Sequence, residues 1–248
     1  MTVSHKTFLY LGAALIAATW VYVVALRPTE WDQVGQSGPA LVTLVGYVAG
    51  ALLLLAGTLP GLPARTVAII PGALVLNIVI GELVGSFALP IYLDSLGTVL
   101  IAALAGPAVG TATGALSSVV WGLINPAALP FAAVSALTGG AAGVIARRGW
   151  LRSAWKLVAS GAVLGAVCGM LAAPVAAFVY GGTAGLGTGA LVSLLREMGN
   201  SLLAAVTLQS FLSDPLDKII VLAVVAATIR LLPDRVLTSL GRRSEQKA

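Results

Sequence analysis

Apolar residues occupy most of this chain in long runs, which short polar or proline-containing breaks separate. A helical run of about 20 apolar residues is long enough to cross the hydrocarbon core of a bilayer. Reading the breaks as loops predicts eight spanning helices, at about 7–26, 40–59, 66–89, 91–105, 107–124, 130–148, 156–180 and 214–232. The run 91–105 is short for a span, so we expect that helix to tilt or to meet a locally thin bilayer. Residues 190–212 are less apolar and predict a helix in the membrane interface or dipping partly into it.

Composition supports the membrane as the main solvent. Hydrophobic residues make up 58% of the chain and charged residues 9%, whereas soluble domains carry about 25% charged residues. The single cysteine, Cys168, excludes an intramolecular disulfide and is interpreted as a small buried filler. The fold class predicted is therefore an all-α polytopic membrane protein.

Charge then fixes the predicted orientation. Eight spans place both termini on one side, and of the 14 Lys and Arg residues only Arg27, Arg196 and Lys218 fall on the other. By the positive-inside rule, both termini are expected to be cytoplasmic, in a bacterial inner membrane. Topology thus explains the net charge of +5 without a nucleic-acid partner. The acids lie mostly on the predicted outer side: Glu30, Asp32, Asp94, Glu197, Asp214 and Asp217.

Small residues recur at four-residue steps in two of the apolar runs. In lipid, such ridges allow helix backbones to approach closely, because Leu against Leu gains little over Leu against an acyl chain. We expect helix packing at Gly106, Gly110, Gly114 and Gly122 in the first run, continued by Ser135, Gly139 and Gly143, and at Gly161, Gly165 and Gly169 in the second.

Residues suited to catalysis are scarce. His5 is the only histidine, and the chain has no zinc-binding motif, no Gly-x-Ser-x-Gly turn and no P-loop. Asp94, Asp214 and Asp217 fall at predicted helix ends, where acids favour the positive end of the helix dipole. We therefore expect a protein that is not an enzyme and has no metal or cofactor.

Polar groups near the outer helix ends are the candidate ligand contacts. Glu82 lies inside a predicted span, where an ionisable group indicates function by default, although it could equally bond a helix break or Arg196. Ser117, Trp121 and Asn125 share one helix face and could stack on and hydrogen-bond a flat polar ligand; the alternative is an interfacial Trp anchor beside an Asn turn. Asn200 and Gln209 could border the same region, or simply face the interface.

Several motifs together resemble a known family. They are Pro-Ile-Tyr-Leu-Asp-Ser-Leu-Gly-Thr at 90–98, Ala-Gly-Pro-Ala-Val-Gly at 105–110, Asn-Pro at 125–126, Leu-Pro-Phe-Ala at 129–132 and Ser-Asp-Pro-Leu-Asp-Lys at 213–218. In this order they resemble the substrate-binding membrane subunits, or S components, of energy-coupling factor (ECF) transporters.

The resemblance implies a six-helix core over 64–233, which two extra helices in 1–63 precede and a basic cytoplasmic tail at 234–248 follows. It also implies capture of a vitamin or similar micronutrient at the outer face, with release driven by a scaffold membrane subunit and two ATPase subunits. Ala64, Ala68 and Gly72 are the counterpart of the family's docking signature, unless they pack against the helix at 40–59. An alternative function is a ligand-sensing or scaffolding membrane module without transport activity.

Overall fold

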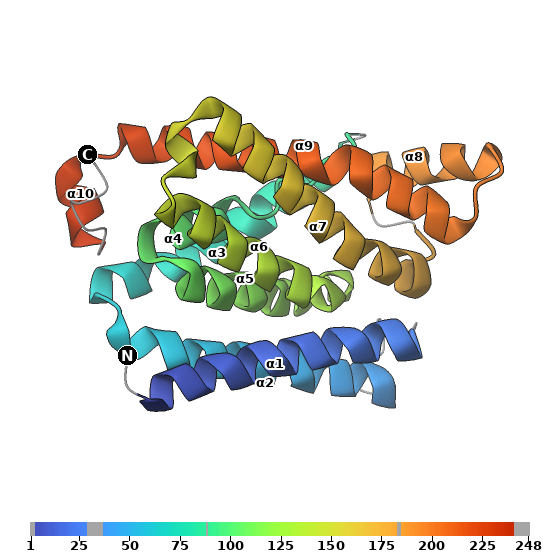
Figure 1. Ribbon diagram of the computed structural model, residues 1–248. Helices are drawn as coiled ribbons and strands as arrows, with labels where there is room; N and C mark the ends of the chain where they lie inside the picture. The colour runs from blue at the N-terminus through green and yellow to red at the C-terminus, as the bar shows by residue number, and fades with distance from the viewer. Residues whose placement is uncertain (1–2, 29–36, 88, 183–184, 241–248) are drawn as a thin grey trace.

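The computed structural model describes residues 3–28, 37–87, 89–182 and 185–240, and within these ranges it contains helices and no strands. The longer elements, shown in Figure 1, are α1 (Val3–Leu26), α2 (Gly38–Thr58), α3 (Ala64–Gly85), α4 (Leu96–Ala105), α5 (Pro107–Gly122), α6 (Ala132–Arg147), α7 (Ala154–Tyr180), α8 (Leu186–Glu197), α9 (Leu202–Leu231) and α10 (Asp234–Ser239). Short 3₁₀ turns lie at Leu59–Gly61, Pro126–Phe131 and Trp150–Arg152.

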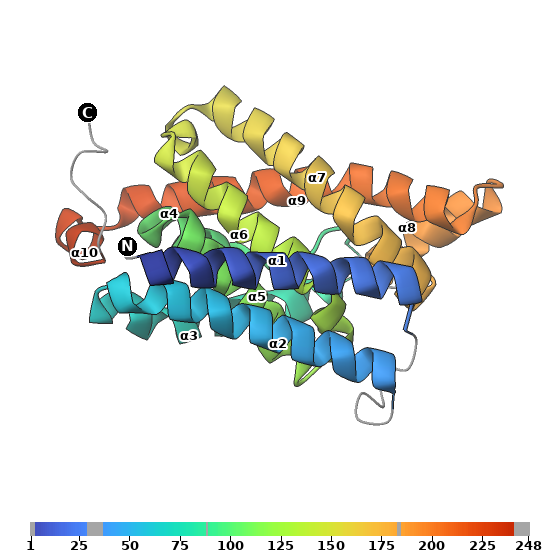
Figure 2. The same ribbon diagram turned by 60° about the horizontal axis from the view of Figure 1, so that its bottom comes forward.

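The helices form a layered bundle. Figures 1 and 2 show α1 and α2 as an antiparallel pair along one side, α7 and α9 along the opposite side, and α3 to α6 between them. Two long-range hydrogen bonds fasten the first pair to the rest: Trp20 Nε1 donates to the Leu171 carbonyl at 3.1 Å, and Tyr47 Oη donates to the Pro130 carbonyl at 3.2 Å. The N-terminal pair is therefore an integral layer of the bundle.

Five helical segments are long and apolar enough to cross a membrane, judged by length and composition: His5–Leu26, Gly38–Gly61, Ala64–Gly85, Pro126–Arg147 and Ala154–Tyr180. Large apolar side chains on their outer faces, such as Val45, Leu52, Val79 and Val163, are exposed. The protein is thus an all-helical, membrane-type bundle. Of the other three predicted spans, α4 and α5 have 10 and 16 residues, and α9 has 30 residues but carries charged side chains in its middle.

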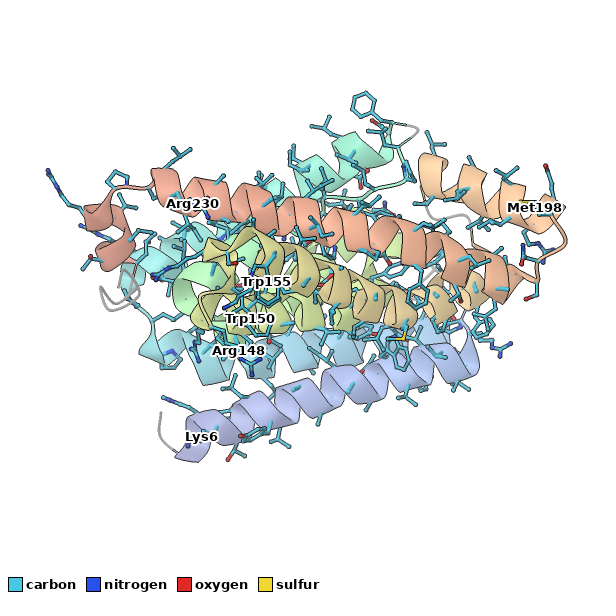
Figure 3. All side chains as sticks on the ribbon, turned by 45° about the horizontal axis from the view of Figure 1, so that its top comes forward. Lys6, Arg148, Trp150, Trp155, Met198 and Arg230 are labelled. Atoms are coloured by element: carbon cyan, nitrogen blue, oxygen red, sulfur yellow. The ribbon has the colours of Figure 1, made fainter. Side chains whose placement is uncertain are left out.

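Chain direction places most of the described basic residues at one end of the bundle, with Arg27 and Arg196 at the other. The start of α1 and the helix α10 lie at the same end of the bundle (Figure 1), and Figure 3 shows Lys6 and Arg230 toward that end and Met198 at the other. Lys218 is the exception to the predicted charge map: it lies inside α9, only 7% exposed, and not in an outer loop. Glu30 and Asp32, as well as Arg242, Arg243 and Lys247 of the tail, lie outside the described residues.

Several boundaries differ from those predicted. Helix α4 begins at Leu96, because residues 89–95 form an irregular linker. Residues 190–212 divide between α8 and α9 at a turn where Gly199 has a φ of 92°. Pro215 does not open a helix: α9 begins at Leu202, with the Ser201 hydroxyl accepting from the Ala204 N–H, and runs through Pro215. Such prolines are tolerated in membrane helices because neighbouring helices support the interrupted backbone.

The segment after α9 is also more ordered than a free tail. Helix α10 ends beside α3, where Thr66 Oγ1 donates to the Leu240 carbonyl at 2.9 Å. Leu240 is buried, and Leu237 packs against the core that includes Val225 and Ile229. The predicted tail therefore begins with a helix that closes the termini end of the bundle.

The glycine ridges lie at the closest helix contacts. A Cβ placed on Gly110 would overlap the Gly139 carbonyl, and one on Gly114 would overlap the Ser135 carbonyl, so α5 and α6 meet backbone to backbone. On α7, Gly161 faces Ile219 and Gly165 faces the Asp214 and Pro215 backbone of α9. The further ridge members are Gly106, where Arg147 lies close, Gly122, where Leu129 lies close, and Gly169, which faces Ser210 and Asp214.

Asn77 fixes the junction of three central helices. Its side chain is fully buried in α3, and its Nδ2 donates to Thr98 Oγ1 at 2.8 Å and to Ser117 Oγ at 3.0 Å. Its Oδ1 accepts from the backbone N–H groups of Gly97 at 2.7 Å and Thr98 at 3.3 Å. Asn77 therefore satisfies the first N–H groups of α4, which an irregular linker leaves without helical partners.

Candidate functional site

The protein contains a cavity of about 390 Å³. Its lining includes the end of α3, the end of α5 and the start of α6, which lie away from the termini in Figure 1. Helices α3, α5, α6, α7 and α9 line it, together with the linker before α4 and the turn after α5. Its lining reaches exposed residues at that end, including Glu82, Ser86 and Gly185. The volume falls within the range of pockets for small organic molecules, about 300–1,000 Å³.

The three predicted contacts Glu82, Trp121 and Asn125 lie together at the outer part of this cavity, where its lining reaches the protein surface. Trp121 Nε1 donates to Glu82 Oε1 at 2.7 Å, and Asn125 Nδ2 donates to the same oxygen at 3.3 Å. The indole lies over Gly81, where a Cβ would be 2.5 Å from the ring. The small residue on α3 thus leaves room for the Trp121 ring beside the carboxylate.

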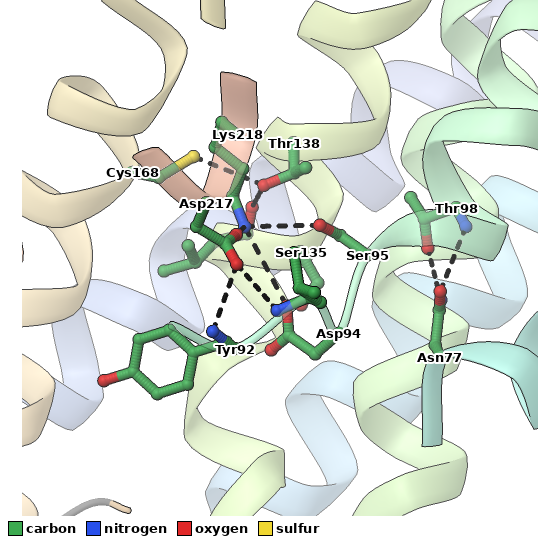
Figure 4. Close-up of polar contacts among 12 residues, drawn as sticks. Asn77, Tyr92, Asp94, Ser95, Thr98, Ser135, Thr138, Cys168, Asp217 and Lys218 are labelled. Atoms are coloured by element: carbon green, nitrogen blue, oxygen red, sulfur yellow. Dashed lines mark hydrogen bonds and ion pairs between the residues drawn. The ribbon is translucent and has the colours of Figure 1, made fainter. Parts of the chain in front are cut away.

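A buried ion cluster lies deeper in the bundle (Figure 4). Lys218 Nζ is 2.6 Å from Asp217 Oδ2, 3.2 Å from Ser95 Oγ and 3.8 Å from Asp94 Oδ1. Asp217 is fully buried, and its Oδ1 accepts from the backbone N–H groups of Tyr92 at 3.1 Å and Leu93 at 2.6 Å. The pair on α9 therefore holds the linker before α4 in place, including Leu93 with its positive φ of 51°.

Asp94 is the member of this cluster on the irregular linker. Its carboxyl lines the cavity and faces Lys218 at salt-bridge distance. Desolvation inside the protein raises the pKa of Asp94, and the Lys218 ammonium opposes this effect. Lys218 is therefore the neighbour that favours the charged form of the Asp94 carboxyl.

Asp214, one helical turn before Lys218, is a further carboxyl in the lining. It is 7% exposed and lies against Gly169 of α7, where an added Cβ would be 2.9 Å from Asp214 Oδ2. One turn earlier, the Gln209 amide donates to Ser213 Oγ at 2.5 Å. Ser210, Asp214 and Lys218, at four-residue spacing on α9, thus line the cavity together with Gln209.

Aromatic and hydroxyl side chains complete the walls. Tyr92 and Phe131 line the cavity beside Trp121, and Phe131 stacks on Tyr180 with ring centroids 5.9 Å apart. Ser118 and Ser135 hydroxyls lie 2.8 Å apart, and Thr138 Oγ1 lies 3.3 Å from Cys168 Sγ. The predicted filler Cys168 is buried, as expected, but it also lines the cavity.

Two other predicted contacts lie elsewhere. Ser117 is buried against Asn77 and is absent from the cavity lining. Asn200 follows α8, where its Nδ2 donates to the Leu195 carbonyl at 2.9 Å, so it caps a helix end away from the cavity. Gln209, by contrast, is buried and belongs to the lining.

Sequence reasoning missed the floor of the cavity, which Asp214 and Lys218 of α9 line, and the buried Asp217 that pairs with Lys218 behind it. Asp214, Asp217 and Lys218 were predicted at an outer helix end, whereas α9 carries them into the bundle interior. The available signal was an Asp-Lys pair flanked on both sides by helix-compatible apolar residues, since charges within a membrane helix usually pair with one another. Asn77 gave no such signal, because a single amide in an apolar run has no periodicity.

The side chains around the cavity have the chemistry to bind a polar organic molecule. Among the described residues, no group of three His, Cys, Asp or Glu side chains is placed to hold a metal ion. The cavity combines carboxylates, one ammonium, amides and aromatic rings, which can orient and stack on a polar organic molecule. Comparison of the chain with protein-family models, with characterised proteins and with solved structures finds no match.

Proposed function

We propose that this chain is the membrane-embedded substrate-binding subunit of an energy-coupling factor transporter. In this proposal it captures a vitamin or similar micronutrient at the outer face of the bacterial inner membrane, with both termini cytoplasmic. A scaffold membrane subunit and two ATPase subunits then drive uptake. The observation that carries the proposal is the cavity of about 390 Å³, whose lining includes helix ends that lie away from the termini.

Four of the five motifs that resemble the family contribute to this cavity, whereas the motif at 105–110 lies outside its lining. Segment 90–98 supplies Tyr92, Asp94 and Ser95, the turn at 125–132 supplies Asn125 and Phe131, and segment 213–218 supplies Asp214 and Lys218. Residues far apart in sequence thus contribute to one ligand-sized space, which favours a shared binding role for the motifs over unrelated helix breaks.

The proposed docking residues have the exposure that docking requires. Ala64, Ala68 and Gly72 are exposed on α3, and a Cβ on Gly72 would meet no atom within 4 Å. The alternative that they pack against the helix at 40–59 does not agree with this exposure. A surface of small residues allows a partner helix to approach closely in lipid.

The chain also lacks an evident energy source of its own. Its sequence contains no P-loop, and its only histidine is His5 near the start of α1. Binding alone equilibrates a solute across a membrane, so accumulation needs a coupled source of free energy. Partner ATPases would supply that source.

Reconstitution tests this function. Liposomes containing the chain together with a scaffold subunit and ATPases, loaded with ATP, should accumulate a radiolabelled compound that the purified chain binds. Liposomes with the chain alone should bind it without accumulation. Uphill uptake by the chain alone would contradict the need for partners, and binding without uptake in every combination would support a ligand-sensing module instead.

A further inference from the structure

Carboxylates outnumber cations around the cavity. Glu82, Asp94 and Asp214 line it, and among the lining residues that the structure describes Lys218 is the only one with a cationic side chain. The Lys218 ammonium is already held at 2.6 Å by Asp217, a carboxylate outside the lining. Uncompensated negative charge in a protein interior within a membrane is costly. The cavity therefore suits an occupant that brings positive charge.

Asp214 points to the place where that charge would bind. Its side chain is 7% exposed and borders the cavity, yet it makes no hydrogen bond to any other residue that the structure describes. An ionised carboxylate offers about four acceptor sites, and buried polar groups are ordinarily hydrogen-bonded. A ligand N–H group would supply the missing donor.

Aromatic side chains are the second feature of the cavity that suits an organic cation. Trp121, Tyr92 and Phe131 all border the same space. Aromatic faces attract cations and stack on flat rings. At the outer part, Glu82 already accepts two hydrogen bonds through Oε1, so Oε2 is the oxygen available to a ligand.

We propose that the cavity selects a small organic cation, with a flat or aromatic part and a protonated nitrogen that donates to Asp214. This inference rests on the proposed function, because it names the substrate class of the same cavity. An organic cation fits better than a metal ion, since no three metal-ligating side chains among the described residues converge there. The volume of about 390 Å³ also exceeds the space that a single ion needs.

Matched compounds test the charge preference directly. One set is tryptamine, tryptophol and indole-3-acetate; a second is benzylamine, benzyl alcohol and benzoate. Within each set the ring is constant and the charge changes from positive to neutral to negative. Binding to the full chain in an uncharged detergent is measured by calorimetry and by the shift in thermal unfolding. The amine should bind most tightly in at least one set, and the carboxylate least tightly in both.

Two variants assign the preference to the cavity floor. Asp214→Asn keeps the shape and removes the charge, and should weaken amine binding about 10- to 100-fold while leaving the alcohol unchanged. Glu197→Gln removes an exposed carboxylate of α8 outside the cavity and should leave every affinity unchanged. If Asp214→Asn does not fold, the binding of the amine, the alcohol and the carboxylate to the wild-type chain still tests the charge preference.

Three results would overturn the inference: equal binding of amine and alcohol, preference for the carboxylate, or no binding of any of the six compounds. An equal loss in Glu197→Gln would also overturn it, because the preference would then be a general surface-charge effect. The outcome for the cation preference can be distinguished from the outcome for the proposed function. A neutral or anionic compound retained from a cell extract and lost in Trp121→Ala would leave the binding function intact and exclude the cation.

Discussion

At the scale of single residues, Asn77 joins three helices through four hydrogen bonds. Asn77→Ala should lower the free energy of unfolding by about 2–3 kcal/mol, because it leaves buried donors and acceptors of α4 and α5 without partners. Thermal unfolding in detergent measures the effect. Asn200→Ala is the matched control, since Asn200 makes one such bond at the end of α8. Equal effects of the two variants would contradict a central role for Asn77.

Lys218 is a buried cation held by Asp217 and Asp94. Lys218→Met should be more destabilising than Lys156→Met, because it leaves the fully buried Asp217 without its cation, whereas Lys156 is exposed. Breaking one half of a buried ion pair typically costs about 3–5 kcal/mol. The double variant Lys218→Met with Asp217→Asn should recover part of the loss. No recovery in the double variant would show that the two residues act independently.

At the scale of elements, the α5–α6 contact depends on glycine. Gly114→Leu places a side chain where the Ser135 carbonyl lies, so the two helices must separate. Overpacking of this kind costs about 1–3 kcal/mol, and the thermal midpoint in detergent should fall accordingly. Gly72→Leu is the control, because nothing lies within 4 Å of the added Cβ. Wild-type stability of Gly114→Leu would contradict the close approach of α5 and α6.

Gly72→Leu also tests the proposed docking surface on α3. Gly72→Leu should keep the stability of the chain and its ligand affinity but weaken association with a scaffold subunit, because it fills the exposed small-residue surface of α3. Co-purification of the scaffold subunit with wild-type and variant chains measures this. Unchanged co-purification would move the docking surface away from Ala64, Ala68 and Gly72.

At the scale of the whole molecule, orientation can be checked with single cysteines in a Cys168→Ala background. Ser86 follows α3 at the cavity end, and Ser153 precedes α7 at the termini end. An impermeant thiol reagent added outside intact cells should label Ser86→Cys and spare Ser153→Cys. The reverse pattern would place the cavity on the cytoplasmic side and exclude capture from outside.

Much of the architecture could be predicted because membrane helices have a simple sequence pattern. Long apolar runs gave the helices, and four-residue steps of glycine gave the tight contacts of α5 and α7. Glu82, Trp121 and Asn125 could be grouped because they occupy matching ends of neighbouring helices. The cavity floor could not, because its position depends on α9 continuing through Pro215 and on the linker at 89–95 entering the bundle. Both depend on contacts with other helices. Locally, Pro215 predicts a helix start, and contacts within the bundle override that preference.

The central claim is that the cavity is a binding site for a small molecule. The most direct measurement equilibrates the purified chain with an extract of its host cells, removes unbound compounds, and identifies by mass spectrometry what the protein retains. Wild type and Glu197→Gln should retain the same compound in near-stoichiometric amount, and Trp121→Ala and Asn125→Ala should each retain about 10- to 100-fold less at limiting concentration. Equal retention by all four chains, or no compound retained by the wild type, would contradict the account.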